Sequence, residues 1–386
     1  MKKYIKSTLL MLLSICLFTA CSDDNDSNPT LVAPTTFVLN TPAIANSVVD
    51  LAHSSAIVLT CTQPDYGFPA STTYSVAVAT KADMSDAVKL STNSLTARIE
   101  LDAKEIAAAL TNIKVEEGAT EADFPMNIPV YFQAEAVITT TMGTAVETSR
   151  IKSNVVSLNK VDLEFSLPPV LLPENIYLVG NFCGWKWDKC VAMAPVYDTN
   201  DTFWHLVYID ESGIKFNTNK AWDGGEVGFA GITINEASEL GAEIVEGGGN
   251  IAASNPGWYL MVVKAVVEGR DIKYDVTFNR PEVWIMGTIT PEAAWAEKEA
   301  GCMFEVPATA DGEFISPAFA HDVSGDGGAR AYVKIEGYDW WKTEFIVGLD
   351  GNKISYRGKG GDQKRVDGKA GQKMYLNFTT DTGKIE

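Results

Sequence analysis

The second half of the chain repeats one plan of short β-strands, and this repeat constrains the fold more than any other feature. Residues 176–180 form an apolar segment that returns about 107 residues later as residues 283–287. Residues 214–216 return as residues 333–335, and a tryptophan stands seven residues after the central lysine of each copy. This period fits a duplicated domain and is too long for a solenoid unit. The repeat therefore predicts two tandem all-β modules, residues 168–281 and 282–386.

Residues 35–160 precede the repeat and show a different pattern. Short alternating stretches separated by Pro, Gly, Asn and Asp turns indicate β-strands, among them residues 57–60, 74–78 and 130–137. A short helix is expected over residues 103–110. Regular strand spacing over about a hundred residues is typical of an immunoglobulin-like sandwich. We therefore expect an all-β chain in which an N-terminal immunoglobulin-like sandwich is joined by a stiff linker, residues 165–169, to two β-sandwich modules.

The first 20 residues are expected to be a targeting segment, followed by a lipidated tether at residues 21–34. Residues 1–20 combine early lysines, an apolar run and small residues before Cys21, as a signal peptide does. The arrangement resembles a bacterial lipobox, which implies acylation of Cys21, although plain secretion with cleavage nearby is an alternative. The acidic run at residues 22–26 resembles the signal that sends Bacteroidetes lipoproteins to the outside of the outer membrane, while a solvated tether, residues 21–34, is a compatible interpretation. We therefore expect a lipid-anchored protein on the cell surface, in the outer membrane.

The charge and the scarcity of histidine narrow the function. Lysine and arginine total 31 against 50 acidic residues, a formal net charge of −19, which makes nucleic acid a poor partner. There are three histidines, and neither an HExxH nor a paired CxxC spacing occurs. The sequence therefore indicates no metal, no cofactor, no catalytic residues and no enzyme activity. With so many carboxylates some pair will lie close by chance, so composition alone leaves glycoside hydrolysis open.

Four of the six cysteines would remain after cleavage and lipidation. Cys183 and Cys190 lie in one short loop and could form a disulfide in an oxidising envelope. Two free, buried thiols are an equal alternative, so the sequence leaves their state open.

All nine tryptophans lie in the two modules, and none occurs in the first 184 residues. Tryptophan offers a flat, partly polar platform for the C–H face of a sugar ring. We expect Trp204, Trp258 and Trp284 to be core because they lie in apolar strands. Clustered aromatic residues in polar loops are more often binding platforms, and in each adjacent pair one ring could be buried. The candidate platform residues are Trp185, Trp187, Trp222, Trp295, Trp340 and Trp341.

Polar donors for sugar hydroxyls are expected beside these rings. Lys215 and Asn217 are two apart on one strand and therefore share a face. Arg330 and Lys334 are placed in the same way in the second module. Charged donors bond neutral hydroxyls more strongly than neutral donors do. The repeated lysine-to-tryptophan spacing favours a binding role over a merely solvated strand.

The first module resembles the starch-binding modules attached to glucoamylases. The resemblance rests on residues 178–182, 184–188, 203–204 and 214–216, and Trp222. In that family two tryptophans and a lysine make one glucan site, and by position these are Trp187, Trp222 and Lys215. The second module follows the pattern more loosely.

The order of lipobox, acidic tether, immunoglobulin-like domain and two such modules resembles the SusE/SusF family of starch-utilisation lipoproteins. The resemblance implies two carbohydrate-binding modules that hold starch or maltooligosaccharides beside a SusC/SusD-like transporter pair. Binding of another polysaccharide, such as a β-glucan or fructan, is one alternative. A structural or adhesin-like surface lipoprotein is the other.

Overall fold

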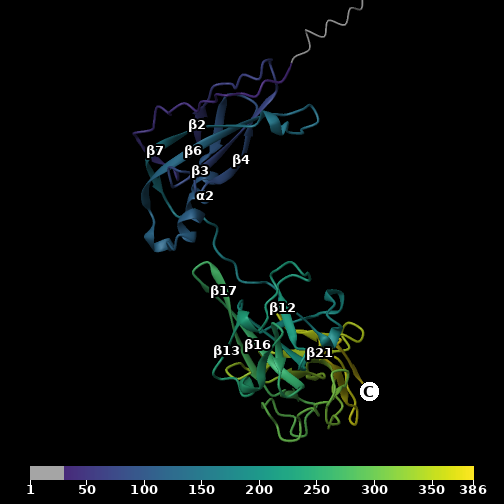
Figure 1. Cartoon of the computed structure of the whole chain (residues 1–386). Coiled ribbons are helices and arrows are strands. Elements are labelled where there is room, and N and C mark those ends of the chain that lie inside the picture. Colours follow the sequence, from purple (N-terminus) through teal and green to yellow (C-terminus); the bar gives the residue numbers. More distant parts are fainter. Residues whose placement is uncertain (1–29) are drawn as a thin grey trace, which may run out of the picture. The chain divides into compact units, whose positions relative to one another are not determined.

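The computed structural model describes residues 30–386 as two compact units, the first ending at Pro169 and the second running from Val170 to Glu386 (Figure 1). The expected signal peptide and Cys21 lie outside the described residues. Strands dominate both units, and α2 (Ala103–Glu116) is the one α-helix of the described chain, which confirms the all-β prediction. Across residues 30–386 no helix is long and apolar enough to cross a membrane.

The first unit contains a five-stranded and a two-stranded sheet. The larger sheet has the order β1-β7-β6-β3-β4, with β1 parallel to β7, and the smaller sheet pairs β2 with β5. Alternate residues of β2 and β5 are buried in one apolar core with the larger sheet, as in a sandwich. The strands are β1 (Val48–Asp50), β2 (Ala56–Thr60), β3 (Thr72–Ala79), β4 (Val88–Ser94), β5 (Arg98–Asp102), β6 (Met126–Ile138) and β7 (Ile151–Leu163).

Helix α2 begins where expected and runs six residues further than the sequence predicted. Asp102 caps its first turn by accepting a hydrogen bond from Lys104 N at 2.8 Å. The added residues include Thr111 and Ile113, which are β-branched and have low helix propensity. Both are buried, so packing against the core extends the helix beyond what propensity alone indicated.

The second unit contains four sheets. We name β14-β15-β12-β8-β9 the outer sheet, β10-β11-β16-β17-β13 the middle sheet, and β18-β20-β21-β22 with β19-β23-β24 the distal sheets. The strands are β8 (Tyr177–Gly180), β9 (Val191–Ala192), β10 (Ala194–Pro195), β11 (Thr202–Ile209), β12 (Ile214–Asn217), β13 (Ile232–Ile234), β14 (Ile244–Gly247), β15 (Asn250–Ala253), β16 (Gly257–Glu268), β17 (Asp271–Asn279), β18 (Val283–Ile285), β19 (Phe314–Ile315), β20 (Ala331–Val333), β21 (Glu344–Val347), β22 (Ile354–Tyr356), β23 (Met374–Asn377) and β24 (Thr382–Ile385). β16 and β17 are its long strands, and both are visible in Figure 1.

The central strands of the middle sheet, β11 and the first half of β16, are buried on both faces. In β16, Tyr259 and Met261 belong to the core shared with the outer sheet. The alternate residues Leu260 and Val262 belong to a second core, shared with the distal sheets. A strand covered on both sides needs a continuous apolar run, which β16 has from Trp258 to Val263. The two sequence repeats therefore fold around a common sheet as one compact unit.

Tryptophans of the first repeat form part of this second core. Trp204 packs edge-on against Tyr356 with ring centroids 5.3 Å apart, and Trp258 packs against Phe314 at 4.9 Å. Both indoles are buried, as expected, and Trp284 is half-buried against the same core. Trp204 and Trp258 therefore join the first repeat to the second, a role that the sequence did not indicate.

One strand is displaced from its expected position. The second-repeat strand predicted at residues 333–335 is β20, which ends at Val333. The chain turns directly afterwards, with Tyr338 N donating to Ile335 O at 3.2 Å and Gly337 at a φ of 82°. Lys334 therefore follows the strand instead of lying within it.

The shared core predicts that the two repeats unfold together. Replacing Trp204 by alanine should lower the free energy of unfolding of the second unit by about 3–5 kcal/mol, because a large buried ring is lost from the joint. Tryptophan fluorescence during denaturant unfolding reports on this unit alone, since all tryptophans lie in it. The exposed Trp222→Ala is the control and should change stability little. Two separate transitions, with only one shifted by Trp204→Ala, would contradict the common core.

Candidate carbohydrate-binding sites

The first cluster of candidate residues lies on the face of the outer sheet that points away from the core. Lys215 of β12 pairs with Val179 of β8, and Asn217 pairs with Tyr177. Paired residues of antiparallel strands project to the same face, so all four side chains share it. Val179 and Trp187 form a small apolar cluster there. The face-sharing of Lys215 and Asn217 is therefore confirmed, and the aromatic loop packs on the same surface.

Three indoles meet on this face. The Trp222 ring lies 6.4 Å from that of Trp185 with an interplanar angle of 32°, and 5.2 Å from that of Trp187 at 61°. Trp222 is 54% exposed and Trp185 is half-exposed. Trp187 is only 8% exposed. The exposed platform is thus the pair Trp185 and Trp222, and Trp187, which the family resemblance placed in the site, supports it from beneath.

The loop carrying Trp185 has an unusual backbone. Gly184 and Trp185 have φ values of 65° and 61°, in the left-handed region that a bulky residue rarely adopts. Trp185 N donates to Gly180 O at 2.9 Å, which fixes the turn. Such strain is maintained only where the surroundings determine the conformation, and it clusters at functional sites. Cys183 and Cys190 in this loop are free thiols, so the disulfide alternative is not adopted.

Asn217 holds the loop that carries Trp222. Its Nδ2 donates to Ala221 O at 3.0 Å and to Asp223 Oδ1 at 2.9 Å, and its Oδ1 accepts from Thr218 N at 2.7 Å. Its side chain is buried. The bonds from Asn217 and from Gly225 N lower the pKa of Asp223. Asn217, predicted as a sugar donor, thus has its polar atoms engaged in positioning the tryptophan loop.

Lys215 is a donor without a protein partner. Within the part of the chain that the structure describes, its ammonium group makes no hydrogen bond or ion pair. Its stem passes Gly228, where an added Cβ would lie 3.3 Å from Lys215 Cε and 1.9 Å from Gly249 O. A residue with a side chain at position 228 would therefore clash. The half-buried lysine is held in place by packing and keeps three free N–H groups.

The second cluster contains a pair of indoles of nearly the same geometry. The rings of Trp295 and Trp340 lie 5.7 Å apart at 31°. Trp295 is 47% exposed, and the Arg330 guanidinium lies 4.5 Å from its ring centroid. A Cβ on Gly287 would come within 2.8 Å of the Trp295 ring, so this glycine makes room for the platform. The structure therefore brings Trp295, Trp340 and Arg330 together.

Trp341 lies elsewhere. Its ring contacts Tyr197 of the first repeat at 5.5 Å, and the Arg357 guanidinium lies 5.1 Å from it. Trp340 and Trp341 share the 3₁₀ turn η9 (Trp340–Lys342), in which successive side chains point about 120° apart. The spacing from Lys334 matches that of Lys215 to Trp222, but the ring that joins the second platform is Trp340. Equal spacing did not mark equivalent rings.

The predicted cations of the second module are engaged with protein groups. Lys334 Nζ lies 2.6 Å from Glu297 Oε2 and donates to Tyr338 O at 3.0 Å. Glu297 Oε1 also accepts from Trp340 N at 2.6 Å, so Lys334 positions this tryptophan through Glu297. Arg330 is 5% exposed and lies 3.3 Å from Glu344 Oε1. Burial lowers the pKa of Arg330.

Sequence reasoning missed a hollow beside Trp295. It has a volume of about 530 Å³, and its lining residues are Trp295, Gly325, Asp326, Arg330, Asp362, Gln363, Lys364 and Arg365. Four of them come from residues 362–365, a polar segment after the glycines at 360 and 361. The polar and charged residues in this segment were the feature of the sequence from which a polar hollow could have been predicted. Within residues 30–386 no group of three His, Cys, Asp or Glu side chains could hold a metal ion.

Comparison with known proteins assigns both units to one family. Residues 175–275 and 282–384 each match the family described as SusF/SusE starch specific CBMs, which are carbohydrate-binding modules. Residues 23–130 match the family described as SusE outer membrane protein.

A curated relative, Outer membrane protein SusF of Bacteroides thetaiotaomicron, is 36% identical over 240 residues, which are 60% of this chain and 47% of the relative. The chain thus spans about half the length of this relative. The crystal structure of SusF from the same organism covers 91% of this chain and 99% of that chain, with 22% identity and a TM-score of 0.48. Because the family matches extend over both repeats and most of the first unit, this chain belongs to the SusE/SusF family of outer-membrane proteins.

Proposed function

We propose that this protein binds starch and maltooligosaccharides at two sites of its second unit and has no catalytic activity. The observation that carries the proposal is the recurrence of two tilted indoles in each repeat, with Lys215 on the sheet face of the first pair and Arg330 against a ring of the second. An exposed indole costs stability unless something covers it, and the C–H face of a sugar ring is a suitable cover. The match to starch-specific modules supports α-glucan as the ligand.

The angle between the rings favours a curved chain. Two indoles inclined at 31–32° do not form one flat platform, because each ring faces a different direction. Successive residues of an α-1,4-glucan turn steadily, so neighbouring sugars can each stack on one ring. The extended chain of a β-1,4-glucan would suit coplanar rings better.

The N-terminal expectations complete the proposal. Acylation of Cys21 would anchor the chain to the outer membrane, and the acidic tether would hold it at the cell surface. A SusC/SusD-like transporter complex would be the partner for import, with captured glucan held nearby. The first unit would act as spacer or docking module.

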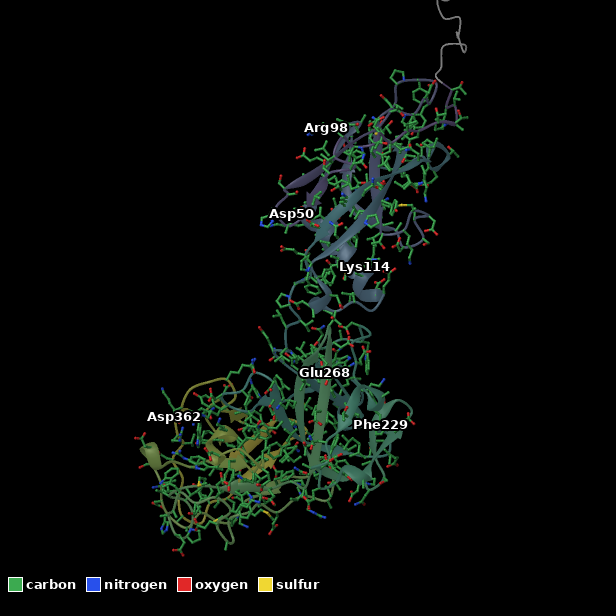
Figure 2. All side chains as sticks on the ribbon, turned by 90° about the vertical axis from the view of Figure 1, so that its left-hand side faces the viewer. Asp50, Arg98, Lys114, Phe229, Glu268 and Asp362 are labelled. Carbon is green, nitrogen blue, oxygen red and sulfur yellow. The ribbon has the colours of Figure 1, made fainter. Side chains whose placement is uncertain are left out.

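Two sites on one rigid unit would act together on a polymer. Phe229 marks the first site, because it follows Gly228, which contacts Lys215, and Asp362 marks the second site, because it lines the hollow beside Trp295. Figure 2 shows these two residues on opposite sides of the second unit. A short oligosaccharide would occupy one site at a time. A branched polymer can engage both, which raises the apparent affinity by effective concentration.

Each exposed indole pair should be required for one binding event. Trp185→Ala with Trp222→Ala should abolish the first site, and Trp295→Ala with Trp340→Ala the second, so isothermal titration with maltoheptaose should give one site per protein in either variant. The affinity of the substituted site should fall at least about tenfold, because both stacking surfaces of that site are removed. Two unchanged sites in either double variant would contradict the assignment.

A polysaccharide panel serves as the companion measurement. Affinity electrophoresis of the soluble chain in gels containing starch, a β-glucan or a fructan should show retardation by starch. Retardation by one of the other polymers alone would favour the alternative ligand, and retardation by none would favour a structural role.

Lys215 should contribute affinity without contributing stability. Lys215→Met keeps the aliphatic stem and removes the ammonium, so first-site affinity should fall about threefold to tenfold through loss of a charged donor. Lys264→Met is the matched control, since Lys264 is an exposed lysine on β16 without a partner in the described chain. The measurement is titration of the Trp295→Ala, Trp340→Ala background. Equal affinity for both lysine variants would remove Lys215 from the site.

A further inference from the structure

Three arginines converge on one buried carboxylate beside the second platform. Glu344 of β21 has no exposed side-chain surface, and its oxygens lie 3.3 Å from Arg330, 3.1 Å from Arg357 and 3.3 Å from Arg365. All three guanidinium groups are largely buried. One carboxylate can neutralise one of them.

The positive charge of the other two arginines is only partly neutralised, and the carboxylate that does so lies at the surface. Asp362, which is 71% exposed, lies 2.5 Å from Arg365 and 3.6 Å from Arg357. Arg365 lowers the pKa of Asp362, which keeps this carboxylate ionised. Counting both acids, the cluster retains one net positive charge in a chain whose net charge is −19. Lys364 adds a cation and Asp326 a carboxylate on the wall of the hollow, so the net charge of the cluster with its hollow stays at one positive charge.

Hydrogen-bond donors also remain. A guanidinium carries five N–H groups, and the contacts of each arginine in the described chain use at most three. The Nε atoms of Arg330, Arg357 and Arg365 are buried without an acceptor among residues 30–386. Burying cations is costly unless their charge is compensated, so a ligand that supplies negative charge in the hollow would stabilise the cluster.

We propose that the second site recognises α-glucan that carries a phosphate monoester, with the phosphate in the hollow formed by Arg330, Lys364 and Arg365. The inference rests on the proposed function and names the substrate class of that site. Trp295 is both a ring of the platform and a wall of the hollow, so a sugar stacked on it can direct a substituent inward. A phosphate offers three acceptor oxygens and close to two negative charges, which match the fork geometry of arginine.

Asp362 holds the place of the phosphate in the unliganded protein. Its carboxylate bonds Arg365 from the solvent side, where it can be displaced without opening the core. The first site offers an internal contrast, because the cations at its sheet face are the lysines Lys215 and Lys220, and both oxygens of Asp223 accept hydrogen bonds within the tryptophan loop. Phosphate on the glucan should therefore affect the second site only.

The test compares one amylopectin rich in phosphate with the same polymer after phosphatase treatment. The variant Trp185→Ala, Trp222→Ala, which keeps the second site, should bind the phosphorylated polymer about tenfold more tightly. The variant Trp295→Ala, Trp340→Ala should bind both polymers equally. Equal affinities in the first variant would overturn the phosphate proposal and leave starch binding standing, whereas binding of neither polymer by the unsubstituted chain would overturn both.

Two further substitutions, made in the Trp185→Ala, Trp222→Ala variant, are expected to change binding of the phosphorylated polymer in opposite directions. Arg365→Gln should remove the preference for the phosphorylated polymer, so that this variant binds the untreated and the phosphatase-treated polymer with equal affinity. Asp362→Asn should strengthen binding of the phosphorylated polymer about threefold, because a competing carboxylate is lost. Asp350→Asn, another exposed acidic residue of the unit, controls for net charge and should have no effect.

Asp362 is exposed, so its substitution tests the proposal even where Arg365→Gln destabilises the buried cluster. Unchanged affinity of Asp362→Asn would contradict the place-holding role and overturn the assignment of Arg365. Titration with inorganic phosphate alone separates the two sources of the anion. Weak or undetectable binding is expected because no sugar engages the indoles, and tight binding would overturn the commitment to a glucan phosphate.

Discussion

The second unit depends on a sheet that has no solvent-facing side at its centre. β11 and β16 contribute alternate side chains to two cores, one with the outer sheet and one with the distal sheets. Each repeat therefore completes its burial through the other. This arrangement turns a tandem sequence repeat into one rigid body, and it fixes both platforms on the same scaffold. The two apolar cores lie on either side of the middle sheet. The outer surfaces of the unit can therefore carry exposed indoles and irregular loops.

The two sites reach similar ring geometry with different supports. In the first, Asn217 and Asp223 hold the tryptophan loop by neutral and charge-assisted hydrogen bonds, and Lys215 remains without a partner. In the second, the cations themselves hold the rings, because Lys334 acts through Glu297 and Arg330 stacks on Trp295. The first site therefore keeps a lysine free of protein partners within the described residues, whereas Lys334 and Arg330 of the second site help to hold the indoles.

The sequence predicted features that depend on neighbouring residues and missed features that depend on residues far apart in the chain. Local periodicity correctly indicated most of the strands, the helix start at Ala103 and the core role of Trp204 and Trp258, although β20 ends at Val333 and not at residue 335. Local periodicity did not predict burial that depends on distant residues. The polar neighbours of Trp187 suggested that it is exposed, but its ring is buried and packs against Trp222. The Glu344 cluster escaped for the same reason, since Arg330 and Arg365 are 35 positions apart and meet only through β21.

Both sites contain features that are unfavourable to the folded protein by itself. The left-handed Trp185, the exposed rings of Trp222 and Trp295, and the incompletely neutralised arginines each lower stability. A common core of two repeats is what allows the chain to tolerate them. We interpret the unfavourable features beside the two indole pairs as retained for a ligand. Stacking would relieve the exposed rings, and an anionic substituent would relieve the arginines, so each site's instability describes the chemistry of what it binds.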